Sequence, residues 1–318
     1  MNSTLILNDF EKAIIATISY FDIFNYPLTL VEVNKWLYRY ANSSYSELLK
    51  TLEGENLKGI IEARNGFYFM RGRQEIIKTR LWRYQIAEPK FRIALKTAGW
   101  LRYLAFIKSI AVCNNLGFNN SVSDGDIDFF IITRRGRLWW SRLVVTLWVA
   151  LMGIRRHGNK VVNRICLSFY LADDHLDLSD VALQPTDTYL SYWISTLAPI
   201  YNRDSTYQNF LSGNVWLKND LPNFYPTHSS YRRMVVDNRW AKFSKSIDEF
   251  ILGGLVGDFL EKMSRLLQIK KISHYVGKLV REKNHQVVIS SSILKLHTTD
   301  RRLYYQNIWR DKIKEFII

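Results

Sequence analysis

Residues 120–135 read NSVSDGDIDFFIITRR, with three aspartates at the entrance to a run of apolar residues. The apolar run is typical of a buried β-strand. Side chains alternate along a strand, so Asp126 and Asp128 are expected on one face and the apolar residues beside them on the other. Two adjacent carboxylates repel each other unless a cation lies between them. The pair therefore predicts either a divalent metal site or the solvated polar end of a strand.

The segments around this strand predict a small mixed sheet covered by helices, and the expected fold class is α+β. Residues 107–113, 126–133 and 162–171 have strand character, and residues 138–154 form an apolar run of helical length. Because Arg142 lies inside that run, we expect a buried globular helix and no stable membrane insertion.

The first 75 residues have the pattern of a winged-helix-like domain. Three segments have helical periodicity, and Thr29 is suited to cap the second of them. Two short β-prone runs then flank Asn65 and Gly66, a pair that favours a tight hairpin. Three helices followed by a hairpin predict a winged helix at residues 1–75.

The charges of the third helical segment leave two roles open for this domain. Acidic Glu47, Glu53 and Glu55 accompany basic Lys50 and Lys58. A helix that reads DNA needs a basic face, whereas a mixed-charge helix also suits docking of another protein. Nucleic-acid binding and protein docking both stay possible for the winged helix.

Two further domains are expected after the first. A charged helical segment at residues 74–104, interrupted at Pro89, leads into the sheet of a domain at residues 76–180. Beyond about residue 175 the pattern is mostly helical, which predicts a helical C-terminal region at residues 181–318.

Composition limits the classes of partner and compartment. The chain of 318 residues is 47% hydrophobic, which is enough to bury more than one core. Its 44 Lys and Arg against 29 Asp and Glu give a net charge of +15, which favours an anionic partner such as nucleic acid, nucleotide phosphates or a membrane surface. The two cysteines, Cys113 and Cys166, lie in apolar runs, and no secretory signal opens the chain. We therefore expect a cytoplasmic protein without a disulfide scaffold or a Cys-based zinc site.

Residues 110–132, IAVCNNLGFNNSVSDGDIDFFII, resemble the core of the nucleotidyltransferase superfamily that includes DNA polymerase β and kanamycin nucleotidyltransferase. That pattern is a strand, a Gly-Ser pair, a connecting segment and an Asp-x-Asp motif on the next strand. Here Asn114 and Asn115 occupy the Gly-Ser positions, and Asp126 and Asp128 form the motif. The wider series FDIFNYPLT, NGFYF, SDGDIDFFIIT, GRLWWSR and RRHG is similar to bacterial nucleotidyltransferase domain-containing proteins.

The resemblance implies a Mg²⁺-dependent transfer of an NMP from an NTP, with ATP as the expected nucleotide, to a hydroxyl of an unidentified acceptor. Asp126 and Asp128 would be the catalytic residues and the ligands of Mg²⁺. Asn114 and Asn115 would contact the phosphates. Ser123 and Arg134 are further candidates for phosphate contacts, although a turn-forming serine and a solvated arginine fit the same sequence.

Two departures from the family pattern support a second hypothesis. Asn114 and Asn115 are bulkier than Gly and Ser, although Asn tolerates the left-handed conformation that Gly would supply. The third carboxylate of active relatives has no clear counterpart, because the next strand offers Ser168 and reaches Asp173 only at its end. The alternative is a catalytically degenerate fold that binds a nucleotide or nucleic acid as a regulatory protein.

Three other segments have simpler interpretations. Residues 155–160, RRHGNK, suit the end of the apolar helix, where cations complement the helix dipole. Residues 253–257, GGLVG, favour close helix packing. Residues 295–302, KLHTTDRR, are either a helix cap or a clamp for a nucleotide or substrate.

Overall fold

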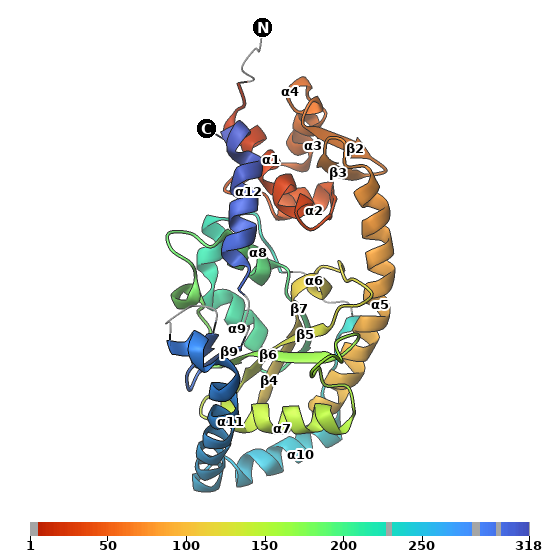
Figure 1. The fold of residues 1–318 in the computed structure, drawn as a ribbon. Coiled ribbons are helices and arrows are strands. Elements are labelled where there is room, and N and C mark those ends of the chain that lie inside the picture. The colour runs from red at the N-terminus through yellow and green to blue at the C-terminus, as the bar shows by residue number, and fades with distance from the viewer. Residues whose placement is uncertain (1–5, 227–230, 282–286, 297–299, 318) are drawn as a thin grey trace.

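The computed structural model describes residues 6–226, 231–281, 287–296 and 300–317, and within them the chain forms twelve α-helices and two β-sheets (Figure 1). The α+β class predicted from the sequence is confirmed. The smaller sheet belongs to the N-terminal region, and the larger one gathers strands from the middle and the end of the chain.

The N-terminal region places short helices around a three-stranded sheet. Its elements are α1 (Asp9–Asp22), β1 (Leu28–Thr29), α2 (Leu30–Lys35), α3 (Tyr45–Leu52), α4 (Glu55–Lys58), β2 (Ile61–Arg64) and β3 (Phe67–Met70). The strands are antiparallel in the order β1-β3-β2. The third predicted helical segment is thus two helices, α3 and α4, separated at Gly54.

Local sequence signals explain the ends of these elements. Thr29 caps α2 in a capping box with Glu32, as its position before the apolar run predicts. Asn65 and Gly66 have φ angles of 53° and 76°, which the tight hairpin between β2 and β3 requires. Both features arise from residues close in sequence, which is why the sequence alone indicates them.

The larger sheet has six strands. They are β4 (Ile107–Val112), β5 (Ile127–Thr133), β6 (Ile165–Ala172), β7 (Ala198–Asn202), β8 (Val287–Ile289) and β9 (Ile293–Leu296). The spatial order is β7-β4-β5-β6-β9-β8, and the β5–β6 pair is parallel while the other pairs are antiparallel. The expectation of a helical region at residues 181–318 is wrong in this respect, because β7, β8 and β9 complete the sheet.

The remaining described helices follow the N-terminal sheet along the chain. They are α5 (Glu75–Leu101), α6 (Asn114–Gly117), α7 (Leu138–Leu151), α8 (Thr188–Ser195), α9 (Thr206–Gly213), α10 (Arg239–Ile251), α11 (Leu255–Arg281) and α12 (Arg302–Ile317), with 3₁₀ turns at Ser179–Val181, Val215–Asn219 and Tyr231–Arg233. The predicted interruption at Pro89 is absent, since α5 continues through that residue. A proline removes one helical hydrogen bond but does not by itself end a helix.

The apolar segment predicted to be a buried helix forms α7, which lies against β6 and α11. Leu138, Trp139 and Val145 are buried, whereas Leu147 and Leu151 are exposed. The predicted helix is therefore buried along one face only. Among the described residues, none of the helices has the length and apolar character needed to cross a bilayer.

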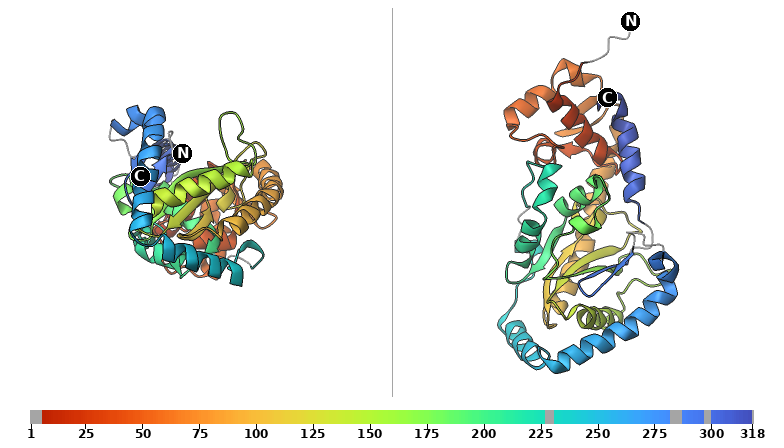
Figure 2. Two further views of the ribbon diagram at one scale, coloured as in Figure 1. Left: turned by 90° about the horizontal axis from the view of Figure 1, so that it is seen from below. Right: turned by 90° about the vertical axis from the view of Figure 1, so that its left-hand side faces the viewer.

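The last helix returns to the first. α12 packs along α1 and the start of α8, so segments from opposite ends of the sequence lie side by side (Figures 1 and 2). Trp309 Nε1 donates a 2.8 Å hydrogen bond to the carbonyl of Ala16, and Lys312 forms a 2.7 Å ion pair with Asp22. One hydrophobic core runs from α1 through α8 to one face of the larger sheet.

Candidate functional site

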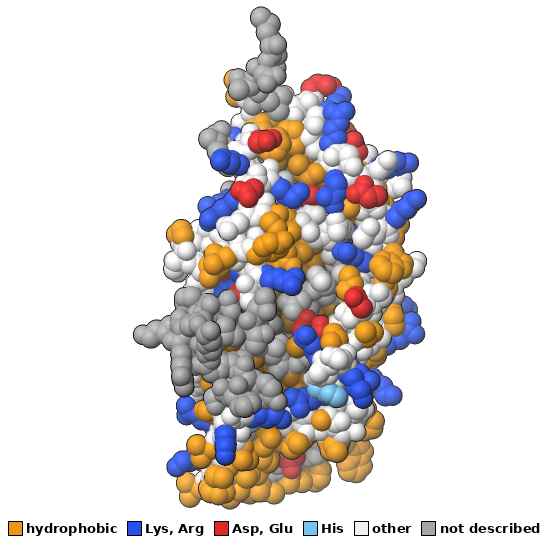
Figure 3. Space-filling model, viewed as in Figure 1, with side chains coloured by type: hydrophobic (Ala, Val, Ile, Leu, Met, Phe, Trp, Pro, Cys, Tyr) orange, Lys and Arg blue, Asp and Glu red, His pale blue; other side chains and the backbone are white. Residues whose placement is uncertain are grey.

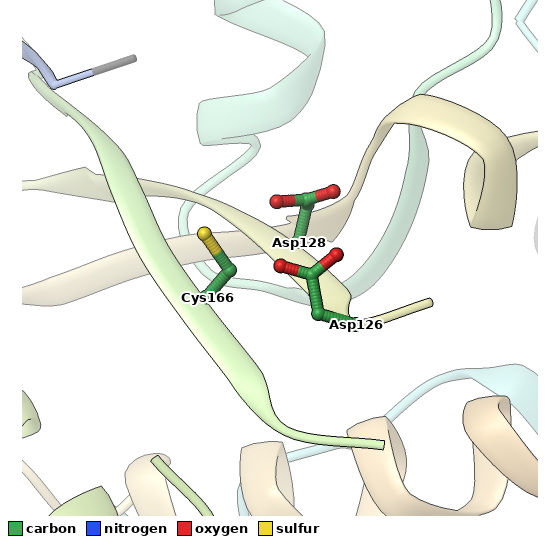
Figure 4. Close-up of side chains that lie close together, drawn as sticks. All are labelled: Asp126, Asp128 and Cys166. Carbon is green, nitrogen blue, oxygen red and sulfur yellow. The ribbon is translucent and has the colours of Figure 1, made fainter. Parts of the chain in front are cut away.

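The two aspartates of the Asp-x-Asp motif lie at the start of β5. Figure 4 shows the carboxyl groups of Asp126 and Asp128 on the same side of the strand, with the thiol of Cys166 beside them on β6. One possible metal-ligand atom of each of these three residues lies within 4.8 Å of the others. Cys166 reaches this place because Asp128 and Cys166 are partners in the parallel β5–β6 register.

The electrostatics of Asp128 reflect this crowding. Burial, followed by the negative charge of Asp126, raises the pKa of Asp128 to about 6, and a hydrogen bond from Asn114 acts in the opposite direction. A cation placed beside a carboxyl group in this environment strongly stabilises its charged form.

Asn114 orients Asp128 directly. Its Nδ2 donates a 2.8 Å hydrogen bond to Asp128 Oδ2, and its Oδ1 accepts a 2.9 Å bond from Trp193 Nε1 on α8. The φ angle of Asn114 is 54°, the left-handed conformation expected where the resembled family has glycine. The side chain is thus held at both ends, and the sequence interpretation does not include its bond to the carboxylate.

Arg156, in the loop between α7 and β6, supplies a cation beside Asp126. Its Nη1 lies 2.7 Å from Asp126 Oδ2 and 3.6 Å from Cys166 Sγ. The arginine side chain is 47% exposed, so water competes for it and the ion pair is a weak restraint. The helix-end interpretation of residues 155–160 does not include this contact.

Lys90 supports the loop that leads into β5. This α5 residue is almost fully buried, and its Nζ donates a hydrogen bond to the carbonyl of Gly125. Burial lowers the pKa of Lys90, whereas the charges of Asp126 and Asp124 raise it. The sequence offers no local signal for this contact, because it joins a helix to a loop 35 residues away.

Cys166 occupies the position where a third ligand would be expected. Burial, followed by the charge of Asp128, raises the pKa of the Cys166 thiol to about 12. At neutral pH the thiol is protonated, and it is a soft donor that does not match Mg²⁺. In the described part of the chain, no third carboxylate joins Asp126 and Asp128 in a group of metal-ligating side chains.

The other predicted site residues divide into two groups. Asn115 lies beside Asn114 and lines the same cavity as Asp128. Ser123 is exposed in the loop before β5, outside the lining of that cavity. Arg134 follows the opposite end of β5, where its guanidinium lies 5.8 Å from the centre of the Phe106 ring. The structure therefore brings Asn114, Asn115, Asp126 and Asp128 together but leaves Arg134 at a distance.

A cavity of about 300 Å³ opens beside Asp128, and that volume suits a small molecule. Aromatic side chains make up about half of its lining residues. The rings come from α1, α8, α12 and β6 and from the residues that follow α1 and α6, and they include Tyr20, Phe24, Phe118, Tyr189, Trp193 and Tyr305. Tyr189 and Tyr305 are stacked, with ring centres 5.7 Å apart. Flat aromatic ligands such as nucleobases suit a cavity of this kind.

Charged residues line another part of the cavity wall. Lys295 lies on β9, and Asp300, Arg301 and Arg302 lead into α12. Asp300 forms ion pairs of 3.0 Å with Lys295 and 2.7 Å with Arg302. It also accepts a 2.9 Å bond from the backbone N–H of Arg302. These residues therefore fix the start of α12 as well as lining the cavity. Residues 297–299 of the same predicted segment lie outside the described part of the chain.

Comparisons of the chain with family models, curated proteins and solved structures found no match. The chemistry of the site therefore has to be argued from its own donor atoms. The two carboxylates fit a hard divalent cation such as Mg²⁺, and phosphate oxygens and water would complete its ligands. The thiol of Cys166 does not fit that cation.

Proposed function

We propose that this protein is a Mg²⁺-dependent nucleotidyltransferase that moves an NMP from an NTP to a hydroxyl of an unidentified acceptor. The observation that carries the proposal is the Asp126–Asp128 pair, in which Asp128 is oriented by the left-handed Asn114 and lies at the wall of an aromatic cavity. A carboxylate pair, a backbone turn suited to close approach and a small-molecule cavity are thus in one place.

Each of these residues would have a separate role in such a reaction. Asp126 and Asp128 would hold Mg²⁺, which neutralises phosphate charge during transfer. Asn114 keeps Asp128 turned toward the site, and the stacked rings hold the base of the nucleotide. Arg301 is exposed at the wall of the same cavity and places positive charge near the phosphates.

The reaction balances without a redox partner. The acceptor oxygen forms a bond to the α-phosphorus, the bond from that phosphorus to the β-phosphate oxygen breaks, and pyrophosphate leaves. The hydroxyl proton passes to solvent, because the protonated thiol of Cys166 is not a base at neutral pH. We expect a modest rate for this reason.

The proposal also covers the N-terminal domain and the cellular location of the protein. The element order α1-β1-α2-α3-α4-β2-β3 with the sheet order β1-β3-β2 supports a winged helix, with the short α4 added before the hairpin. Both described cysteines are free and buried, in keeping with a reducing, cytoplasmic location.

The direct test is release of pyrophosphate. The purified chain is incubated with Mg²⁺, a pool of hydroxyl-bearing acceptors and NTPs labelled at the α-phosphate. We expect transfer of label that is lost in Asp126→Asn and Asp128→Asn. Asp124→Asn is the matched control, since Asp124 is exposed in the same loop outside the carboxylate pair. Absence of both pyrophosphate and labelled product from the wild type would refute the transferase proposal.

A second candidate is nucleotide binding without transfer. Cys166 in place of a carboxylate and Arg156 beside Asp126 favour it, because the arginine supplies the positive charge that a metal ion would otherwise bring. Equilibrium dialysis with labelled ATP separates the two functions. Binding that persists without pyrophosphate release supports the second candidate, and a salt-dependent shift of duplex DNA would add a nucleic-acid role for the winged helix.

A further inference from the structure

The end of the molecule farthest from the N-terminal region is covered by apolar side chains (Figure 3). They come from α7, α10 and α11, which lie together at that end (Figure 1). Phe250 is 89% exposed, Leu255 87% and Leu151 84%. We call this the basal surface, formed by Leu147, Leu151, Trp240, Phe243, Ile247, Phe250, Ile251, Leu255, Val256, Phe259, Met263, Leu266 and Leu267.

On α10 the apolar face points outward. Trp240, Phe243, Ile247 and Phe250 are spaced to lie on one face of a helix, and all are exposed. The opposite side of α10 faces the protein and carries Ala241 and Lys245, which are buried. A surface helix ordinarily buries its apolar stripe against the core, so α10 has the reverse orientation.

The first part of α11, residues 255–268, has the same inverted arrangement. Its buried side includes Gly257, Ser264 and Gln268, and the amide of Gln268 donates a 2.8 Å hydrogen bond to the carbonyl of Trp139 on α7. Its outer side carries Phe259 and Leu266. Along residues 255–268 small and polar residues therefore make the contacts with the protein and large apolar residues face outward, whereas Ile269 and Ile272, farther along α11, pack against the core.

Arg137 holds the two helices in place. This buried residue donates hydrogen bonds of 3.0 Å to the carbonyl of Leu252 and 2.9 Å to that of Gly253, at the junction of α10 and α11. It also forms a 2.7 Å ion pair with Asp258. The outward direction of the apolar stripes is thus built into the packing of the junction.

The charge at the margins of the basal surface is positive. Exposed basic residues of α10 and α11 accompany the apolar stripes, and they are Arg239, Lys242, Lys262, Arg265 and Lys271. Among the described side chains these helices carry four carboxylates; Asp248 is half-buried, and the other three are engaged in specific contacts. Glu249 pairs with Arg203, Glu261 accepts hydrogen bonds from the first amides of α7, and Asp258 pairs with Arg137.

We propose that the basal surface docks the protein on an anionic lipid bilayer. The apolar side chains would enter the boundary between headgroups and acyl chains, and the basic residues would contact the headgroups. The described helices are not suited to cross the bilayer, so the protein would lie on it. A second copy of the chain is a poorer occupant, because its own basic margin would oppose this one.

Vesicle co-sedimentation of the full chain tests this proposal. We expect binding to vesicles of phosphatidylcholine with about one-third phosphatidylglycerol, and several-fold weaker binding to phosphatidylcholine alone or in about 0.5 M salt. Phe250→Ser/Phe259→Ser should weaken binding by about tenfold or more, since both side chains lose their apolar contact with lipid. Lys242→Glu/Lys262→Glu should weaken binding to the anionic vesicles specifically.

The matched control is Leu81→Ser/Trp82→Ser, which removes two apolar side chains, each 52% exposed, from α5. It should bind as the wild type does. Circular dichroism confirms that each variant is folded before binding is compared. Absence of binding to anionic vesicles would overturn the proposal. So would a wild-type dimer in light scattering that Phe250→Ser/Phe259→Ser converts to a monomer, because self-association would then account for the surface.

Discussion

Arg156 and Asp126 form a 2.7 Å ion pair across 30 residues of sequence. The pair exists because β5 and β6 are parallel, so the chain must return along α7 before it enters β6. That return brings the loop before β6 next to the start of β5, where Asp126 lies. The positive charge at the candidate metal site is therefore a consequence of strand direction.

Removal of this arginine should strengthen binding of a divalent cation. Arg156→Ala leaves Asp126 and Asp128 without the competing charge, and we expect the affinity for Mn²⁺ to rise by about threefold, a modest factor because the pair is partly exposed. Calorimetric titration measures the change. Arg155→Ala, in the same loop, should leave the affinity unaltered. Equal or weaker affinity in Arg156→Ala would show that the arginine does not compete with the cation.

A carboxylate at position 166 should make stability depend on the metal. In Cys166→Asp, three carboxylates would face one another, so we expect a lower Tm than wild type in EDTA and a larger rise in Tm when Mg²⁺ is added. Cys166→Ser is the uncharged control and should respond to Mg²⁺ as the wild type does. The same Mg²⁺ response in both variants would argue against a metal site between β5 and β6.

The conformation of Asn114 should appear in unfolding experiments. Asn114→Ala loses two hydrogen bonds and puts alanine at a φ of 54°, so we expect the free energy of unfolding to fall by about 2–4 kcal/mol. Asn114→Gly loses the same bonds without the backbone strain. Its free energy of unfolding should therefore be lowered by about 1 kcal/mol less than that of Asn114→Ala. Urea titration at neutral pH compares the two. An equal decrease in the free energy of unfolding for both variants would mean that the left-handed conformation causes no strain in Asn114→Ala.

The Asp300 cluster should weaken in acid. Burial alone would raise the pKa of Asp300, but the hydrogen bond from Arg302 and the charge of Lys295 hold it below its usual range. Its stabilising effect is therefore complete above the ordinary carboxyl pKa of about 4 and is lost as the pH falls below that value. Asp300→Asn should lower the free energy of unfolding by about 2 kcal/mol at pH 7 and by progressively less toward about pH 3, as measured by urea titration. A cost independent of pH would show that the charge of Asp300 is not what stabilises the start of α12.

The parts of the fold that depend on neighbouring residues could be predicted from the sequence. The cap at Thr29, the hairpin at Asn65 and Gly66, and the strands on either side of the Asp-x-Asp motif all follow from local patterns. The left-handed Asn114 follows in the same way, because few residues other than Gly and Asn tolerate that conformation.

The rest depends on contacts between distant segments. β7 contains Pro199, which argues against a strand unless its partners are known, and β8 and β9 are short. Lys90 and Cys166 join the site through packing and strand register, which the sequence of either segment does not reveal. The role of Arg156 could have been anticipated, since the parallel pair dictates where its loop must lie.

The packing of α12 on α1 has a consequence for synthesis. The contact between Trp309 and Ala16 joins residues 293 positions apart, so α1 leaves the ribosome long before its partner does. Until then the Tyr20 side of α1 lacks the cover that Trp309 gives it. The N-terminal region thus cannot reach its final packing until α12 has been synthesised, and a chaperone that binds exposed aromatic residues would find its target on the nascent chain before then.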